Sequence, residues 1–168
     1  QKDLGQLDFA ITSLKKAISL NPEYIDAHYN LAVVYTDLGQ LNDALKCYKK
    51  VLTINPGFTE AHNNLANILN NLGRFEDALD SYLNAVNLNP NSAEIYNNIA
   101  NTFKDIGQLD KAVENYNKAL KLNPDFAEAY YNKGIVLKKQ RRFEDAILDF
   151  NKAIFIRPNF SEAHNNLG

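Results

Sequence analysis

The segment Ala93–Phe126, AEIYNNIANTFKDIGQLDKAVENYNKALKLNPDF, matches the rest of the chain when it is shifted by 34 residues in either direction. The prolines keep this spacing, at Pro22, Pro56, Pro90, Pro124 and Pro158. A set of alanines keeps it too, at Ala10, Ala44, Ala78, Ala112 and Ala146. A fixed period of this length indicates an array in which each repeat is one small supersecondary unit.

Each repeat is expected to hold two helices joined by a turn. In the segment 93–126, Ile99, Ala100 and Phe103 have helical spacing, and apolar residues follow one face of a second helix. Glycines that can end the first helix in a left-handed conformation occur at Gly5, Gly39, Gly73 and Gly107. Arg141 replaces the turn glycine of the last repeat, which costs on the order of 1 kcal/mol if the left-handed backbone is kept.

Small residues recur where the two helices of a repeat should cross. The eighth place of each repeat is small, at Ala32, Ala66, Ala100, Gly134 and Gly168. The twentieth place is alanine, at Ala44, Ala78, Ala112 and Ala146. Such residues let two helices approach closely, and stacked helix pairs then share one core.

The sequence therefore predicts an all-α fold, a single array over residues 1–168. Its parts are a partial repeat at 1–24 that supplies a second helix, complete repeats at 25–58, 59–92, 93–126 and 127–160, and the start of a further repeat at 161–168. Both ends fall inside a repeat, as expected for a piece of a longer array.

Composition excludes several function classes. A formal net charge of -2 gives no electrostatic footprint for nucleic acid. No apolar stretch is long enough to span a bilayer and no signal peptide opens the chain, so we predict a cytoplasmic protein without membrane insertion. No catalytic, phosphate-binding or metal-ligand pattern stands out, so we predict no enzyme activity, no cofactor and no metal.

The period and the order N-L-A/G, Y/F, G, A, Y, A, P resemble the tetratricopeptide repeat (TPR) family over essentially the whole chain. The resemblance implies a right-handed α-solenoid, a superhelix of helix-turn-helix repeats whose first helices line a concave groove. It also implies protein or peptide binding and no intrinsic catalysis.

In this family the groove is built mainly from the second, fifth, sixth, ninth, twelfth and thirteenth places of each repeat. The sixth place is always asparagine here, at Asn30, Asn64, Asn98, Asn132 and Asn166. The fifth and ninth places add Tyr29, Asn63, Asn67, Asn97, Asn101 and Tyr131. An amide offers both donors and acceptors, so such a ladder can bond the main chain of an extended peptide.

This asparagine ladder resembles the TPR superhelix of the O-linked N-acetylglucosamine transferases, in which groove asparagines hold an extended substrate segment. The alternative is that the asparagines solvate a helix face or bond one another between repeats. A second groove known in the family, which grips chaperone C-terminal carboxylates, needs lysine at the fifth place and is absent here.

Basic residues gather toward the C-terminal end of the predicted groove. Lys104, Lys138 and Lys139 occupy groove places, and Arg141 and Arg142 follow them. One interpretation is an electrostatic site for an acidic partner segment. The other is that lysines in a last helical turn favour the helix dipole and stay solvated.

Three functions follow from these observations. The leading one is a protein-protein interaction scaffold that binds an extended peptide in the asparagine-lined groove, with Tyr29 and Tyr131 as apolar or stacking contacts. The second is the substrate-recruiting region of a larger glycosyltransferase-like enzyme, whose catalytic domain would lie outside these residues. The third is a structural array that associates with itself head to tail through apolar terminal repeats.

Overall fold

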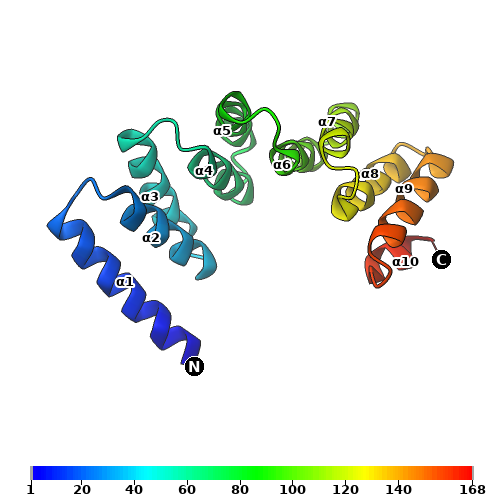
Figure 1. Cartoon of the computed structure of the whole chain (residues 1–168). Coiled ribbons are helices and arrows are strands. Elements are labelled where there is room, and N and C mark those ends of the chain that lie inside the picture. Colours follow the sequence, from blue (N-terminus) through cyan, green and yellow to red (C-terminus); the bar gives the residue numbers. More distant parts are fainter. Residues whose placement is uncertain (1, 168) are drawn as a thin grey trace. The chain divides into compact units, whose positions relative to one another are not determined.

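The computed structural model describes residues 2–167, with side chains described from residue 7 (Figure 1). All secondary structure in these residues is helical, which confirms the predicted all-α class. The helices are α1 (Lys2–Leu20), α2 (Ile25–Asp37), α3 (Leu41–Ile54), α4 (Thr59–Asn71), α5 (Phe75–Leu88), α6 (Ala93–Asp105), α7 (Leu109–Leu122), α8 (Ala127–Lys139), α9 (Phe143–Ile156) and α10 (Ser161–Leu167).

The helices form two compact units, one ending at Leu88 and the other beginning at Asn89. In the first unit α2 pairs with α3 and α4 with α5, while α1 packs on α2 and α3 packs on α4. In the second unit α6 pairs with α7 and α8 with α9, while α7 packs on α8 and α9 packs on α10. Inside the units, α3, α7 and α9 therefore each contact both their own first helix and the first helix that follows.

The predicted small crossing residues lie in the cores of the two units. Six of them have no exposed surface, namely Ala32, Ala44, Ala66, Ala78, Ala100 and Ala112. At Gly134 an added Cβ would lie 2.7 Å from a ring carbon of Phe150, so this crossing requires glycine. Gly168, another member of the set, lies outside the described residues.

The turn after each first helix has one geometry in the four complete hairpins. Gly39, Gly73 and Gly107 have φ angles of 70°, 72° and 76°, and Arg141 keeps the same left-handed backbone at 61°. The next residue donates its N–H to a carbonyl five residues back, as Gln40 does to Tyr35 at 2.8 Å and Arg142 to Leu137 at 2.9 Å. This pattern satisfies carbonyls at the helix end.

Gly5 does not form the turn that its place in the repeat predicted. It lies inside α1, which runs through it from Lys2. Glycine adopts a right-handed helical backbone as well as a left-handed one, so the residue type permits a turn here without imposing it.

The turns between repeats are built from the Asn-Pro pair and from histidine. Asn21, Asn55, Asn89 and Asn123 each accept, through Oδ1, a hydrogen bond from the backbone N–H two residues on. Three fourth-place histidines bring Nε2 to 2.9 Å from the carbonyl oxygen of the preceding turn proline, in the pairs His28–Pro22, His62–Pro56 and His164–Pro158. Histidine thus anchors the start of a first helix to the turn before it.

Arg141→Gly should raise the free energy of unfolding by about 1 kcal/mol, because glycine adopts the left-handed backbone without the Cβ clash that arginine suffers. Gly107→Ala is the matched reverse change and should cost about 1 kcal/mol. A Cβ at Gly107 would meet no atom within 4 Å, so only the backbone responds. Urea unfolding monitored by circular dichroism measures both changes; equal midpoints for wild type and Arg141→Gly would contradict this account.

Candidate functional site

The sixth-place asparagines lie on the first helices, one on each of α2, α4, α6, α8 and α10. Asn30 is exposed and the other four are half-buried. Asn64 donates through Nδ2 to the Tyr29 hydroxyl at 3.1 Å, and Asn166 donates to the Tyr131 hydroxyl at 3.5 Å. Both bonds join neighbouring repeats, so at these two positions the asparagine bonds between repeats.

The ninth-place asparagines are tied to buried tyrosines of the second helices. The Tyr82 hydroxyl donates to Asn67 Oδ1 at 2.5 Å, and the Tyr116 hydroxyl donates to Asn101 Oδ1 at 2.6 Å. Burial raises the pKa of Tyr116 well above its ordinary value, which keeps its hydroxyl a donor. Each of these amide oxygens thus has at least one of its two acceptor sites occupied inside the protein, and the NH2 group remains as a donor for a ligand.

The other two complete repeats lack asparagine at the ninth place, so the aromatic residue of their second helix has no ninth-place amide to bond. The last has Ile135 at that place and Phe150, which carries no hydroxyl, on its second helix. The first has Val33, and burial raises the pKa of the Tyr48 hydroxyl there above its ordinary value. Asparagine and tyrosine therefore occur as partners fifteen residues apart in the two middle repeats. This relation is present in the sequence, but the groove places alone did not predict it.

The fifth-place tyrosines pack inside their own repeats. The Tyr29 ring stacks on Phe58 at 4.9 Å and meets Tyr48 edge-on at 5.8 Å. Tyr131 lies 4.8 Å from Phe160. Both tyrosines are half-buried, so a ligand can meet only the remaining edge of each ring.

Asn63 and Asn97 occupy the same fifth place in the two middle repeats and are the least accessible of the predicted residues, each 7% exposed. Asn97 Nδ2 lies 3.5 Å from Asn98 Oδ1. The Asn97 Oδ1 atom is buried without a hydrogen-bond partner among the described residues. The structure therefore places this pair beneath the first-helix surface.

The basic residues are only partly free to attract a partner. Lys104 is half-buried, with Nζ 3.4 Å from Asn101 Oδ1 and 3.9 Å from a carboxylate oxygen of Asp105. Lys138 donates to Asn166 Oδ1 at 3.3 Å and remains exposed, as does Lys139. Beyond α8, Arg142 pairs with Asp145 at 2.7 Å.

A charged cluster that sequence reasoning did not anticipate lies between α7, α8 and α9. Lys133 Nζ is 3.2 Å from Asp149 Oδ1 and 3.2 Å from Asn117 Oδ1. The Asp149 side chain is nearly buried, and its Oδ2 has no hydrogen-bond partner in the described part of the chain. Burial raises the pKa of the Asp149 carboxyl above its ordinary value, and the Lys133 ammonium offsets part of that rise.

Breaking this ion pair should be costly, whereas replacing both partners should not. The preceding repeat carries Ile99 and Asn115 at the matching places, both buried. Lys133→Ile alone should lower the free energy of unfolding at pH 7 by on the order of 2 kcal/mol, because it leaves the Asp149 carboxylate unpaired. Lys133→Ile combined with Asp149→Asn should restore or exceed wild-type stability.

The pH dependence of the single variant follows from the raised pKa of Asp149. A carboxyl whose folded pKa lies above its unfolded value favours folding at low pH, and this contribution is lost as the pH rises through the folded pKa. The deficit of Lys133→Ile should therefore shrink between pH 7 and pH 4. Urea titrations at both values test this; a constant deficit would show that Asp149 carries no such penalty.

Within residues 2–167, no helix combines the length and apolar character needed to cross a membrane. No group of three or more histidine, cysteine, aspartate or glutamate side chains in the same residues has metal-binding geometry.

Successive α-hairpins with left-handed turns and alanine crossings define a helical-repeat protein. Comparison with known families identifies which kind of repeat it is. A family model described as "TPR repeat" matches residues 2–39, 66–107 and 100–141. Models described as "Tetratricopeptide repeat" match residues 25–58 and 127–160, and residues 47–80. The chain belongs to the tetratricopeptide repeat family, whose fold is the α-solenoid.

Solved structures give the same fold. MamA is 26% identical with a TM-score of 0.86, over 96% of this chain and 94% of MamA. YrrB, described as "a TPR protein with an unusual peptide-binding site", is 25% identical with a TM-score of 0.80, over 98% of this chain and 85% of YrrB. A thermophilic TPR protein of Thermus thermophilus, 24% identical with a TM-score of 0.77 over 98% and 90% of the two chains, supports the fold alone. A search of curated proteins gave no match.

Proposed function

We propose that this chain binds an extended polypeptide segment along the surface of its first helices. The observation that carries the proposal is the sixth-place asparagine, which occurs on every described first helix and is nowhere fully buried. Asparagine is a mediocre helix former, so its recurrence at the sixth place of five helices is not explained by helix propensity. Accessible amides that recur from repeat to repeat suit the regularly spaced N–H and C=O groups of an extended main chain.

The tyrosine hydroxyls support the proposal because they restrict which group each amide presents. Asn67 and Asn101 can offer NH2 donors, while Tyr82 and Tyr116 occupy one acceptor site on each amide oxygen. Asn30 and Asn132 make no side-chain hydrogen bond to any described residue, so both donor and acceptor remain available there. A surface that binds main chain without reading side chains is expected to be permissive in sequence.

The partner segment is proposed to carry acidic residues toward the end that meets α8. Lys138 and Lys139 are exposed in the last turn of that helix. Charge complementarity of this kind sets orientation and association rate more than affinity. The similarity to YrrB, a TPR protein described with a peptide-binding site, supports peptide binding as the general activity.

Asn30→Ala/Asn132→Ala should weaken binding to an array of unstructured peptides by about tenfold or more, since each lost amide bond contributes roughly 1 kcal/mol. These two residues are chosen because neither side chain makes a described internal hydrogen bond, so the fold should be unaffected. Fluorescence anisotropy with labelled peptides provides the affinities, and circular dichroism checks the helicity.

The matched control is Asn42→Ala/Asn151→Ala, which removes one exposed asparagine from a second helix of each unit. This control should bind as the wild type does. Binding that is lost equally in both variants, or retained in both, would exclude the first-helix amides as the contact surface.

Self-association is a second candidate function, and one feature of α9 favours it. Leu148 and Phe155 are 68% and 78% exposed on this helix. The matching places on the other three complete second helices are polar, namely Lys46 and Thr53, Asp80 and Asn87, and Glu114 and Lys121. An apolar surface of this kind, present in the last complete repeat and absent from the three before it, is typical of a contact with another protein surface.

Leu148→Asp/Phe155→Asn, which copies the residues of α5, should keep the chain monomeric at concentrations where the wild type associates. Light scattering over a concentration series measures the mass. Leu83→Asn, which removes another exposed leucine, from α5, should associate as the wild type does. A wild type that stays strictly monomeric at high concentration would exclude this function.

A further inference from the structure

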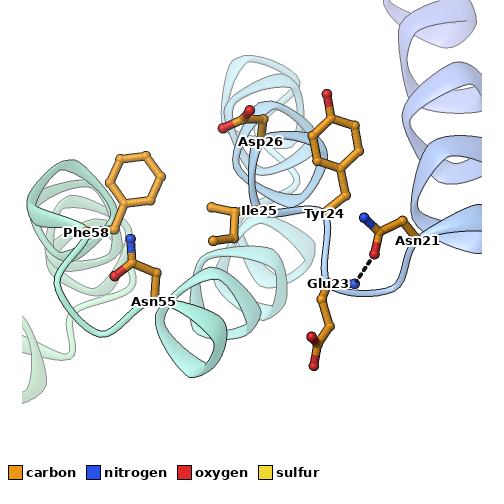
Figure 2. A pocket seen from close by; sticks show the side chains of 7 residues that line it. All are labelled: Asn21, Glu23, Tyr24, Ile25, Asp26, Asn55 and Phe58. Carbon is orange, nitrogen blue, oxygen red and sulfur yellow. Dashed lines mark hydrogen bonds between the residues drawn. The ribbon is translucent and has the colours of Figure 1, made fainter.

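An open pocket of about 450 Å³ lies in the first unit, between two successive inter-repeat turns. Figure 2 shows Tyr24 and Asp26 on one side of Ile25, with Asn55 and Phe58 from the following turn on the other side. Asn21 and Glu23 complete the lining. The pocket is separate from the asparagines of the first helices, because it is formed by the turns and by the first residues of α2.

The walls combine aromatic rings with negative charge. Phe58 is half-buried and Tyr24 is 45% exposed, so both rings have accessible surface. Asp26 is exposed, and its carboxylate makes no hydrogen bond or ion pair to the described residues. A carboxylate beside an aromatic face attracts a flat organic cation, which can stack on the ring and bond the oxygens at once.

The last complete repeat contains the same site with such a cation already in it. Arg157 there occupies the place that Asn55 has in the first complete repeat, and Glu128 and Phe160 match Asp26 and Phe58. The Arg157 guanidinium lies 4.9 Å from the centre of the Phe160 ring and pairs with the Glu128 carboxylate. The chain thus fills its own second copy of the site with an arginine side chain.

The backbone of the two sites is also equivalent. Asn55 has φ and ψ angles of -132° and 92°, and Arg157 has -126° and 91°. The difference is therefore in the side chains: asparagine folds back to bond the N–H of Gly57 at 3.0 Å, and arginine extends over the ring. With asparagine in place, the aromatic face and the carboxylate are left for another molecule.

The repeat 93–126 shows why the pocket is not a general feature of these turns. It has Asn123 and Phe126 at the matching places, but Ser92 stands where the first pocket has the aromatic wall Tyr24. Its carboxylate, Glu94, is engaged in interactions of its own. Only the first complete repeat combines an aromatic residue, an acid, an asparagine and a second aromatic residue at these four places, namely Tyr24, Asp26, Asn55 and Phe58.

We infer that this pocket binds the guanidinium group of an arginine side chain presented by a protein partner. The guanidinium would stack on Phe58 and pair with Asp26, as Arg157 does with Phe160 and Glu128. Lysine is a poorer occupant because its ammonium is compact, strongly hydrated and not planar. The inference does not depend on the proposed peptide surface, since the residues and the chemistry both differ.

The test is an NMR titration of the wild-type chain with capped single amino acids. N-acetyl-arginine amide should shift the backbone amide signals of Ile25, Asp26 and Phe58, with a dissociation constant on the order of millimolar, as expected for one side chain. N-acetyl-citrulline amide has nearly the same shape without the charge, and should bind at least about tenfold more weakly. N-acetyl-lysine amide should also bind more weakly. Equal shifts from arginine and citrulline would overturn the inference.

Exchange variants make the test specific to the pocket. Asn55→Arg should fill the pocket from within and abolish the arginine-induced shifts, and Asp26→Asn should weaken binding about tenfold or more. Arg157→Asn should open a second site and produce new shifts at Glu128 and Phe160. Asp80→Asn, an exposed acid on α5, is the charge-matched control and should bind as the wild type does.

Each outcome decides between the pocket and its alternatives. Undiminished binding by Asn55→Arg, or the absence of new shifts in Arg157→Asn, would show that the two sites are not equivalent and would overturn the inference. Shifts confined to the first-helix asparagines would place the cation elsewhere and also overturn it. The peptide surface is tested with Asn30→Ala/Asn132→Ala and a peptide array, whereas the pocket is tested with other variants and capped amino acids. Failure of one proposal can therefore be distinguished from failure of the other.

Discussion

The close approach of the two helices within each repeat is the constraint on which the other features depend. Alanine at the eighth and twentieth places brings the two backbones together, as at Ala100 and Ala112, which have no exposed surface. A large aromatic side chain of the second helix then fills the space beside the crossing. Tyr48, Tyr82, Tyr116 and Phe150 are all almost completely buried there. Interiors packed this tightly leave a buried hydroxyl no water, so it must find a protein partner.

The need to bond these buried hydroxyls also engages asparagines on the surface of the first helices. Asn67 and Asn101 lie on the candidate binding surface, yet their oxygens serve the buried tyrosine hydroxyls. Where the second helix carries Phe150, the ninth place is Ile135 and no amide is needed. Packing and recognition therefore share residues in this chain. At Asn67 and Asn101 the core engages the amide oxygen, and the NH2 group remains available to a ligand.

Periodicity alone was enough to predict the helical class and the buried crossings. It also placed Arg141 at the turn-glycine position but left open whether the left-handed backbone is kept, and the structure keeps it at a φ of 61°. The turn predicted at Gly5 was wrong, because α1 continues through this residue and glycine permits a turn without imposing one.

The candidate sites were harder to read from sequence. A sixth-place asparagine looks alike in every repeat, but whether it bonds a neighbour depends on Tyr29 or Tyr131 one repeat earlier. The burial of Asp149 does not follow from the repeat pattern, because it depends on how α8 and α9 pack. The pocket beside Phe58 required side-chain volumes from two turns and the position of one arginine about a hundred residues away.

The bond from Asn64 to Tyr29 has a consequence for how such a chain can change by exchange of hairpins. It spans 35 residues, one more than the repeat, so it always joins two different hairpins. A hairpin with tyrosine at the fifth place needs an amide from the hairpin that follows it. Every first helix described here carries asparagine at the sixth place, so any of them can supply that amide. Hairpins with tyrosine at the fifth place and hairpins with asparagine there can therefore be reordered by recombination, and each tyrosine hydroxyl still meets an amide from the hairpin that follows. The sixth-place asparagine thus makes the hairpins interchangeable.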